Sequence, residues 1–476
     1  MRYSIQIIAS ELRALFRTAV LPVLTAVCLA AGSCALFYGH HVTQQRVAGI
    51  DSMQRQYTER YTAMYTSLRA DTATEQGKQN YQAAIEPAVV EYRLYNNAVQ
   101  LPGAMSVLAI GMSDVARHYY PVKINAGYTP AEEKLSNPQQ LMTGNFDLAF
   151  VCIYLLPLML IALTYNLFSQ EQEQGTLKLL IIQQGSFRRI LLMRLCIRWV
   201  LLLLLVTFLI LAGIIFLPAG IPVNAGEVWA WIAVTAAYTL FWAGVCWVVT
   251  TWGKSSGVNL IALLSCWLLL LVVMPAVIHF RISDTGVTDD TATNASRQRD
   301  IAWDTWELPQ RQLLDSFYQV YPQYRNHLAY DTSEGSMRRS MAYYQLAEQR
   351  MDRILAPQQQ RRQQQLAGVT AAYAWSPAVY AQALYSRIAH TDITDDYYFR
   401  QQVTAFREQW KHYFYGFYFN NRQFTAAAYA TIPKYQPAGD PDAGRMIGKG
   451  ILYLTAAGIV LLAAGCVIAG RRNIQL

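Results

Sequence analysis

A short polar segment between two long apolar runs carries the residues best placed to contact a partner. Residues 169–180 (SQEQEQGTLKLL) follow the apolar run 146–168 and precede a basic stretch and another apolar run. Glu171 and Glu173 favour the start of a helix, because carboxylates interact well with a helix N-terminus, and Gly175 permits a tight turn. Two spans joined by an amphipathic segment that is first acidic and then basic are typical of a membrane subunit to which another protein binds from the cytoplasm.

The sequence contains no complete nucleotide-binding loop. Residues 439–446 (GDPDAGRM) have two glycines at the spacing of such a loop, but they lack the lysine and the hydroxyl residue that contact phosphate and magnesium. Residues 253–256 (GKSS) have the lysine, but Val248 stands where the first glycine is needed. The seven histidines show no metal spacing, and no hydrolase motif occurs. We therefore expect no enzyme activity and no cofactor in this chain, so that any ATP and magnesium are bound by partner subunits.

Polar side chains within the apolar runs are the candidates for a substrate path. They are Tyr154, Thr164, Tyr165, Asn166, Thr235, Tyr238 and Ser265. Hydrogen bonding between neighbouring helices is the alternative role for each of them. The charged residues in these runs (Asp147, Glu227 and Lys449) lie near the run ends, whereas an ion or proton path usually keeps a charge at mid-bilayer. This pattern argues against a proton- or sodium-coupled transporter.

Six apolar runs are long enough for the roughly 20 residues that cross a bilayer. They lie at 18–38, 146–168, 199–217, 228–250, 259–280 and 447–470. The first run is longer than the core of a signal peptide, so we expect an uncleaved anchor. The chain of 476 residues is 53% hydrophobic and 15% charged. These features predict a mainly α fold built on a six-helix transmembrane bundle.

Positive charge predicts that both termini lie in the cytoplasm. The first 17 residues together with 169–198, 252–257 and the tail 471–476 hold eleven Lys and Arg against three acids. The insertions 39–145 and 281–445 are close to neutral by comparison. Because short loops rich in Lys and Arg stay in the cytoplasm, the net charge of +8 reflects topology and contact with anionic lipid. Nucleic-acid binding is not expected, since no basic patch with stacking aromatics stands apart from the membrane ends.

The two insertions are predicted to form a mostly helical periplasmic domain. Residues 44–70 are polar and helix-favouring, so they are expected to continue the first span outward as a stalk, whereas 101–124 look irregular or strand-like. In the second insertion, 283–296 have the composition of a linker. Residues 300–365 and 367–419 look mainly helical, with breaks at Pro322, 331–335, Pro357 and Ser376. The many tyrosines indicate packing of a helical domain, with an aromatic binding surface as the alternative.

The segment 137–180 resembles the ABC-2-type permeases, which are membrane subunits of a large class of ATP-driven transporters. The strongest match is the pattern Glu-x-Glu-x-Gly-Thr-Leu at Glu171, Glu173, Gly175, Thr176 and Leu177. Residues 303–321 and 375–415 are similar to a bacterial subfamily with large periplasmic insertions, catalogued as a domain of unknown function. The six-span layout agrees, although Gln172 and Gln174 occupy spacer positions that are often charged in relatives.

The resemblance implies a fold like that of type V exporters, in the bacterial inner membrane. It implies that the cytoplasmic segment 169–198 couples the chain to an ATPase, assisted by an amphipathic connecting helix at 1–17. The coupling residues would be Glu171, Glu173, Gly175, Thr176, Leu177, Phe187, Arg188 and Arg189. An interfacial helix that touches only lipid is the alternative. The implied partners are two ABC ATPase subunits and a second permease half, either a homodimer mate or a paralogue.

Export or extraction of a substrate towards the periplasm is the function that the resemblance implies. The alternative is a mechanotransmitting subunit, whose periplasmic domain acts on a periplasmic partner while the bundle carries no substrate. A continuous polar cavity between the spans would favour transport. A tightly packed bundle with long rigid stalks would favour transmission.

Overall fold

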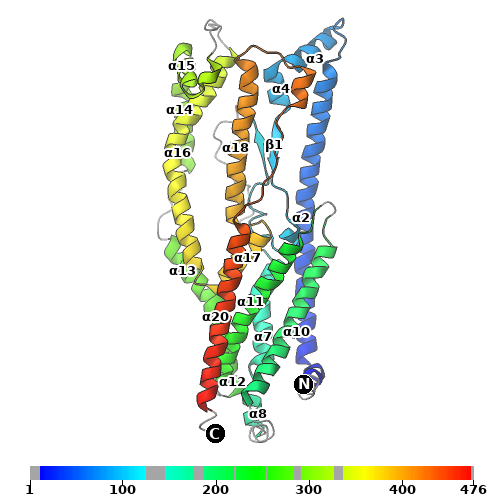
Figure 1. Ribbon diagram of the computed structural model, residues 1–476, viewed down its shortest axis with the longest axis vertical. Coiled ribbons are helices and arrows are strands. Elements are labelled where there is room, and N and C mark those ends of the chain that lie inside the picture. Colours follow the sequence, from blue (N-terminus) through cyan, green and yellow to red (C-terminus); the bar gives the residue numbers. More distant parts are fainter. Residues whose placement is uncertain are drawn as a thin grey trace.

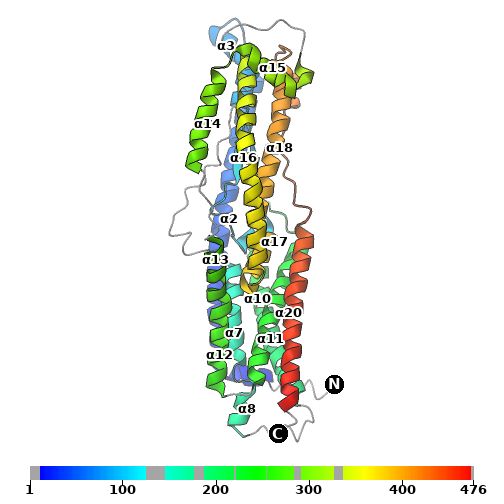
Figure 2. The ribbon, with the colours of Figure 1, turned by 90° about the vertical axis from the view of Figure 1, so that its left-hand side faces the viewer.

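The structure, a computed structural model, describes residues 11–124, 145–175, 187–218, 221–252, 255–283, 291–325 and 336–472. The chain forms an elongated, mainly helical molecule with two halves (Figure 1). The lower half contains six apolar helices, which we call the bundle. The upper half contains the two large insertions, which we call the head. The molecule is also narrow in the perpendicular view (Figure 2).

Six helices among the described residues are long and apolar enough to cross a membrane, as predicted. They are Val20–Ser67, Leu148–Glu173, Arg189–Ile215, Ala225–Thr251, Ser256–Ile278 and Ala443–Gly470. The most apolar stretches of the second and fourth are 67% buried, against 11% to 33% for the other four. The second and fourth therefore form the centre of the bundle, and the protein is a multi-pass membrane protein.

Two spans contain a π-helical turn just before a proline. The second span consists of α6 (Leu148–Phe150), the π turn η2 (Val151–Leu155), α7 (Leu156–Thr164) and α8 (Ser169–Glu173). The fifth consists of α12 (Ser256–Leu268), the π turn η3 (Leu269–Val273) and α13 (Met274–Ser283). Pro157 and Pro275 each follow their π turn by two residues. Proline lacks the N–H that a regular helix needs, so the wider turn absorbs the disruption.

Small residues let the remaining spans approach closely. The third and fourth spans are α10 (Phe187–Ile215) and α11 (Ala225–Thr251), and the last is α20 (Ala443–Arg472). A Cβ atom added at Gly458 of α20 would lie 2.9 Å from the backbone nitrogen of Phe241 in α11. Close backbone contact through glycine is a usual way for membrane helices to pack.

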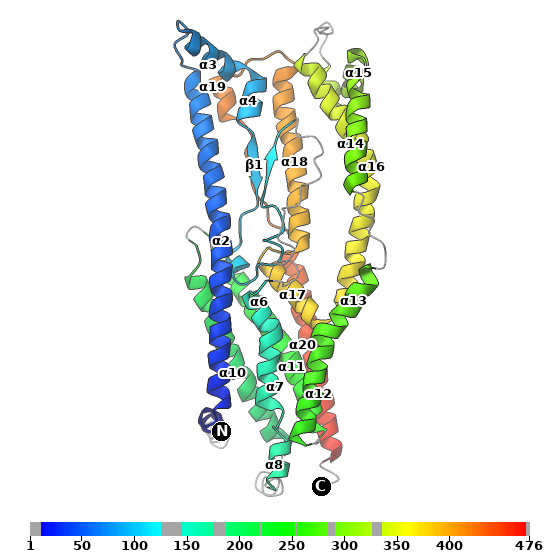
Figure 3. The same cartoon turned by 180° about the vertical axis from the view of Figure 1, so that it is seen from behind.

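The first span continues out of the bundle as a stalk. Helix α2 (Val20–Ser67) runs without a break for 48 residues, which is about 70 Å at 1.5 Å per residue. It passes from the lower end of the bundle to the top of the head (Figure 3). The prediction of a helical stalk at 44–70 is thus confirmed to Ser67.

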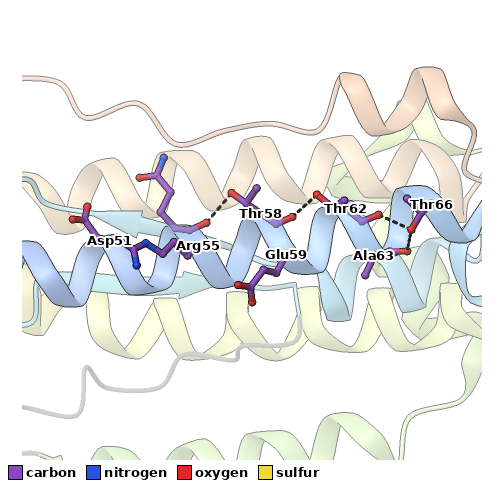
Figure 4. A pocket seen from close by; sticks show the side chains of 8 residues that line it. Asp51, Arg55, Thr58, Glu59, Thr62, Ala63 and Thr66 are labelled. Atoms are coloured by element: carbon purple, nitrogen blue, oxygen red, sulfur yellow. Dashed lines mark hydrogen bonds between the residues drawn. The ribbon is translucent and has the colours of Figure 1, made fainter.

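Between Asp51 and Thr66 the stalk carries a shallow, open depression that is lined mainly by polar, exposed side chains (Figure 4). The hydroxyls of Thr58, Thr62 and Thr66 each donate to the carbonyl one turn earlier, at 2.8 to 2.9 Å. These hydroxyls are therefore satisfied within the helix itself.

The head joins both insertions in one core. Its elements are α3 (Glu75–Ile85), α4 (Pro87–Arg93), β1 (Asn96–Val99), η1 (Ala104–Val107), β2 (Tyr119–Val122), α14 (Thr291–Trp306), α15 (Gln310–Val320), η4 (Pro322–Tyr324), α16 (Met337–Tyr373), α18 (Ile393–Tyr418) and α19 (Ala426–Ala430). Strands β1 and β2 are antiparallel, with Asn96 opposite Val122. The Phe424 amide donates to the Ile85 carbonyl at 2.8 Å, which ties the second insertion to the first.

Aromatic packing and one buried cation hold the helices of the head together. Several tyrosines pack in the core of the head, since Tyr415 and Tyr429 are at most 1% exposed, as are Trp410 and Phe414 of α18. Lys411, on the same helix, is 1% exposed and donates to Glu408 at 2.8 Å and to Glu348 of α16. Burial lowers the pKa of Lys411. The ion pairs compensate for the cost of removing this charge from water.

Two expectations about the second insertion were wrong. Pro357 does not break the chain, because α16 continues through it to Tyr373. The proline is exposed, so the carbonyl that it leaves unpaired faces water, and the surrounding Gln and Ala residues favour helix. The supposed linker at 283–296 is helical from Thr291, where α14 begins.

Candidate functional site

The predicted coupling residues lie at the lower end of the bundle. Glu171 and Glu173 are on α8, and Gly175 ends that turn with a φ of +70°. This left-handed conformation favours glycine and agrees with the expected tight turn. Phe187, Arg188 and Arg189 open α10, while Thr176 and Leu177 lie outside the described residues.

Glu171 belongs to an ion-pair network that joins three segments. Its carboxylate lies 2.9 Å from the guanidinium of Arg194 on α10, and Arg194 lies 3.2 Å from Glu11. Glu11 also pairs with Arg198 at 2.6 Å. Residues 11–17 are helical, in agreement with the amphipathic helix predicted at 1–17, and 1–10 lie outside the described residues. The network fixes this helix to α8 and α10.

The buried member of the network is Arg198. It is 8% exposed and donates to the carbonyl of Leu163 as well as to Glu11, which is 7% exposed. Each of these buried charges is stabilised by the other, because removal of either one would leave a buried and uncompensated charge. Sequence analysis counted Glu11 and Arg198 only toward the charge of the cytoplasmic side. Their pairing depends on the fold, which brings together residues 187 positions apart.

Glu173 attaches α8 to a different helix. Its carboxylate accepts hydrogen bonds from the amide and hydroxyl of Ser256 at 2.8 and 2.9 Å, at the start of α12. The Ser256 hydroxyl also lies 2.8 Å from that of Ser169. Glu173 thus stabilises the N-terminus of α12, where a negative charge is favourable. The two glutamates of the motif thus attach α8, where the segment 169–198 begins, to α10 and α12. The side chains of Gln172 and Gln174, beside them, are exposed.

The seven candidate path residues lie in different surroundings. Thr164, Thr235 and Tyr238 are at most 2% exposed, and each donates to a carbonyl or meets a hydroxyl. Tyr154 and Tyr165 are half-buried, and their backbone carbonyls, not their side chains, accept from Trp267 and Asn259. Tyr154 is among the residues that line a hollow at the upper end of the bundle. Asn166 bonds Gln170 at 3.1 Å, and Ser265 is exposed on the outside of α12. For most of these residues the structure shows hydrogen bonds between or within helices.

A second polar centre, which sequence reasoning missed, lies where the head meets the bundle. Helix α17 (Pro377–Ile388) packs on α11, where the Tyr385 hydroxyl lies 2.9 Å from that of Thr235. The next turn places His390 in a left-handed conformation, with a φ of 56°. Its ring nitrogens lie 3.6 Å from Glu227 of α11 and 3.9 Å from Asp395 of α18. His390 therefore faces a carboxylate of the bundle and a carboxylate of the head.

The electrostatics of this junction favour a charged histidine. Interaction with Asp395, and then with Glu227, raises the pKa of His390 to about 9 from 6.5, against an opposing effect of burial. Within the described part of the chain, no group of three or more His, Cys, Asp or Glu could hold a metal ion. The arrangement is suited to joining two parts of the molecule by charge.

Part of the head matches a known family. Residues 290–438 match the model of a family described as a domain of unknown function, DUF3526. The match contains both 303–321 and 375–415, the segments that resemble a subfamily with this kind of description. Neither the curated proteins nor the solved structures provide a match to this chain. The assignment to ABC-2-type permeases is therefore still a prediction.

Replacing Glu11 by Gln should destabilise the lower end, because Arg198 would keep its charge in a buried site. Breaking a buried pair costs about 3–5 kcal/mol. Thermal unfolding of the purified protein in detergent should show a clearly lower melting temperature. Glu59→Gln on the exposed face of α2 is the matched control and should leave it unchanged. Equal melting temperatures for the two variants would contradict the network.

The stability of the junction should depend on pH through His390. Its pKa is raised in the folded state, so its contribution is complete below about pH 6.5 and is lost as the pH rises through about 9. His390→Asn should therefore lower the melting temperature at pH 6.5 more than at pH 9 or above. Asparagine tolerates the left-handed backbone, and any remaining strain does not depend on pH. A pH-independent difference between the variant and the wild type would refute this assignment.

Proposed function

We propose that this chain is the membrane subunit of an ATP-driven ABC-2-type transporter in a bacterial inner membrane, and that it transmits motion to its periplasmic head. It has no ATPase site of its own and works with two ATPase subunits and a second permease half. The observation that carries the proposal is α2, an uninterrupted helix of 48 residues that links the lower end to the top of the head. A displacement at one end of such a helix is conveyed to the other.

The ion-pair network supports the same proposal. Glu11 ties the helical residues 11–17, which lie two residues before α2, to α10 through Arg194 and Arg198, and Arg194 extends the link to Glu171 of α8. A partner ATPase that moves the segment after α8 would thus act on the base of the stalk. The exposed side chains of Gln172, Gln174 and Arg189 are available for that contact.

The packing of the spans favours transmission over a path through one copy of the bundle. Thr164, Thr235 and Tyr238 are buried and bonded within the protein, which is the arrangement of interhelical contacts. Helix α17 gives the bundle a second connection to the head, because its C-terminal turn continues directly into α18. Movement of α11 would reach the head through Tyr385 and His390.

Export or extraction of a substrate is the second candidate function. The observation that favours it is a hollow of about 590 Å³ at the upper end of the bundle, lined by residues of the second and fifth spans. A path between two copies of the chain would also be compatible with the exposed Ser265 on α12.

Coupling to an ATPase is testable by co-purification in mild detergent with mass spectrometry and an ATPase assay. The double substitution Gln172→Arg, Gln174→Arg alters the exposed surface of the loop and leaves the Glu171 and Glu173 contacts in place. We expect the wild type to recover an ATPase and this variant to lose it at an unchanged melting temperature.

The matched control for co-purification is Gln79→Arg, Gln82→Arg on the exposed face of α3 in the head. It should retain the ATPase. Recovery of the enzyme by all three proteins would place the coupling contact elsewhere, and recovery by none would refute the transporter assignment.

Transmission through the stalk predicts ATP-dependent movement of the head. Spin labels at Gln76 of α3 and Gln364 of α16, both exposed, should report a distance change when ATP is added to the complex. Asp51→Pro introduces a proline into the exposed middle of α2, where it disrupts the helix at a cost of about 3 kcal/mol. The movement should then be lost while the ATPase stays bound. An immobile head in the active wild-type complex would favour transport instead.

A further inference from the structure

A hollow at the junction of bundle and head has the shape and chemistry of a ligand site. Its volume is about 590 Å³, and its walls come from the second span, the fifth span, α17 and the loop around Met112. None of the residues that line the hollow belongs to the ion-pair network at the lower end. The hollow therefore needs an explanation of its own.

The bundle side of the hollow is apolar and extends below the ends of the spans. Its residues include Ile153 and Tyr154 of the second span and Leu271 and Pro275 of the fifth. Tyr154 lies six residues from the upper end of its span at Leu148. At 1.5 Å per residue the hollow thus reaches about 9 Å along the span from that end.

Both π turns lie in this wall. Ile153 and Tyr154 belong to η2, and Leu271 belongs to η3. π turns are rare and occur frequently at functional sites. The carbonyls of Ile153 and Tyr154 accept hydrogen bonds from the Tyr238 hydroxyl at 3.0 Å and the Trp267 indole at 3.3 Å. The protein itself therefore satisfies the disturbed backbone, and the hollow is preformed.

The head side of the hollow is polar and acidic. Asp114 and Asn145 line it, and each keeps one enclosed side-chain oxygen without a hydrogen-bond partner among the described residues. The carboxylate of Asp147 adds a negative charge, although it also accepts from the amides of Ile110 at 3.0 Å and Phe150 at 2.8 Å. The described lining contains no lysine or arginine. Unpaired acceptors beside carboxylates are complementary to a cation that donates hydrogen bonds.

We propose that this hollow binds an amphiphile with a primary ammonium head and an apolar tail. The ammonium group lies against Asp114 and Asn145, and the tail lies along Tyr154 and Leu271. The apolar wall reaches into the depth of the span, so the favoured source is an aminophospholipid of the surrounding leaflet. A soluble alkylammonium compound has the same chemistry. This inference does not depend on an ATPase partner, since binding requires only the folded chain.

Photolabelling of the purified full chain in nanodiscs tests the site. Phosphatidylethanolamine and phosphatidylglycerol, each with a photoreactive group in the acyl chain, are compared in a phosphatidylcholine bilayer. Labelling of peptides around Tyr154 and Leu271 should be stronger for phosphatidylethanolamine. Asp114→Asn should reduce that labelling about tenfold, the effect expected from one charge-assisted hydrogen bond. Asp51→Asn on the exposed stalk is the matched control and should label as the wild type does.

Leu271→Trp provides an independent test because it fills the apolar part of the hollow without altering charge. It should abolish labelling in variant protein that retains the helical circular dichroism of the wild type. Displacement of the lipid label by dodecylammonium would support the site and identify soluble amines as a second source, whereas no displacement would assign it to the lipid alone. Equal labelling by the two lipids, or full labelling of either folded variant, would overturn the proposal.

Discussion

The absence of water inside a bilayer is the constraint on which this structure depends. A polar group within the spans is stabilised by a partner in the protein, because an unsatisfied group in hydrocarbon costs several kcal/mol. The indole N–H groups of Trp231 and Trp247 are exceptions, since both are buried without a partner among the described residues. The bundle meets this demand at its irregular places. Where the turn before Pro157 widens, Tyr238 bonds the carbonyl of Ile153, and Trp267 bonds that of Tyr154. Where a charge enters the bundle, Arg198 is bonded to Glu11 and to the Leu163 carbonyl.

The same constraint explains how the bundle connects to the head. A helix satisfies its own backbone, so α2 can leave the membrane and continue into water without a change of structure. Its side chains change from apolar to polar along the way, and Arg46 marks the transition, bonded to the Gln100 carbonyl at 2.7 Å. The other connection, α17, depends instead on side-chain contacts, with the Tyr385 ring 4.6 Å from that of Trp231. One link is continuous and stiff, while the other depends on hydroxyl and charge contacts.

Charge is used at both ends of the bundle to hold elements together. At the lower end, Glu171 and Glu173 attach α8 to α10 and α12. At the upper end, His390 lies between Glu227 and Asp395. The hollow beside the upper end differs from both, because its acidic and amide oxygens are not all paired within the described protein. Paired charges indicate a structural contact, whereas the unpaired oxygens of the hollow indicate a candidate binding site.

The sequence by itself determined the number of spans, the helical stalk and the helical character of the head. These features depend on the length and polarity of continuous segments, and such local properties can be read along the chain. Gly175 was predictable for the same reason, since its turn needs only one permissive residue. The linker at 283–296 and the break at Pro357 were wrong, because composition does not show which faces of a helix meet solvent or protein.

Only the tertiary structure decided which polar residues meet. Glu11 and Arg198 are 187 residues apart, and Thr235 and Tyr385 are 150 apart, so no spacing rule connects them. The seven candidate path residues show the same limit. The sequence alone does not distinguish a polar residue that bonds a neighbouring helix from one that lines a cavity. The hollow at the junction arises from four separate segments, two of them with π turns. Packing between distant segments creates such a space, so the local sequence does not predict it.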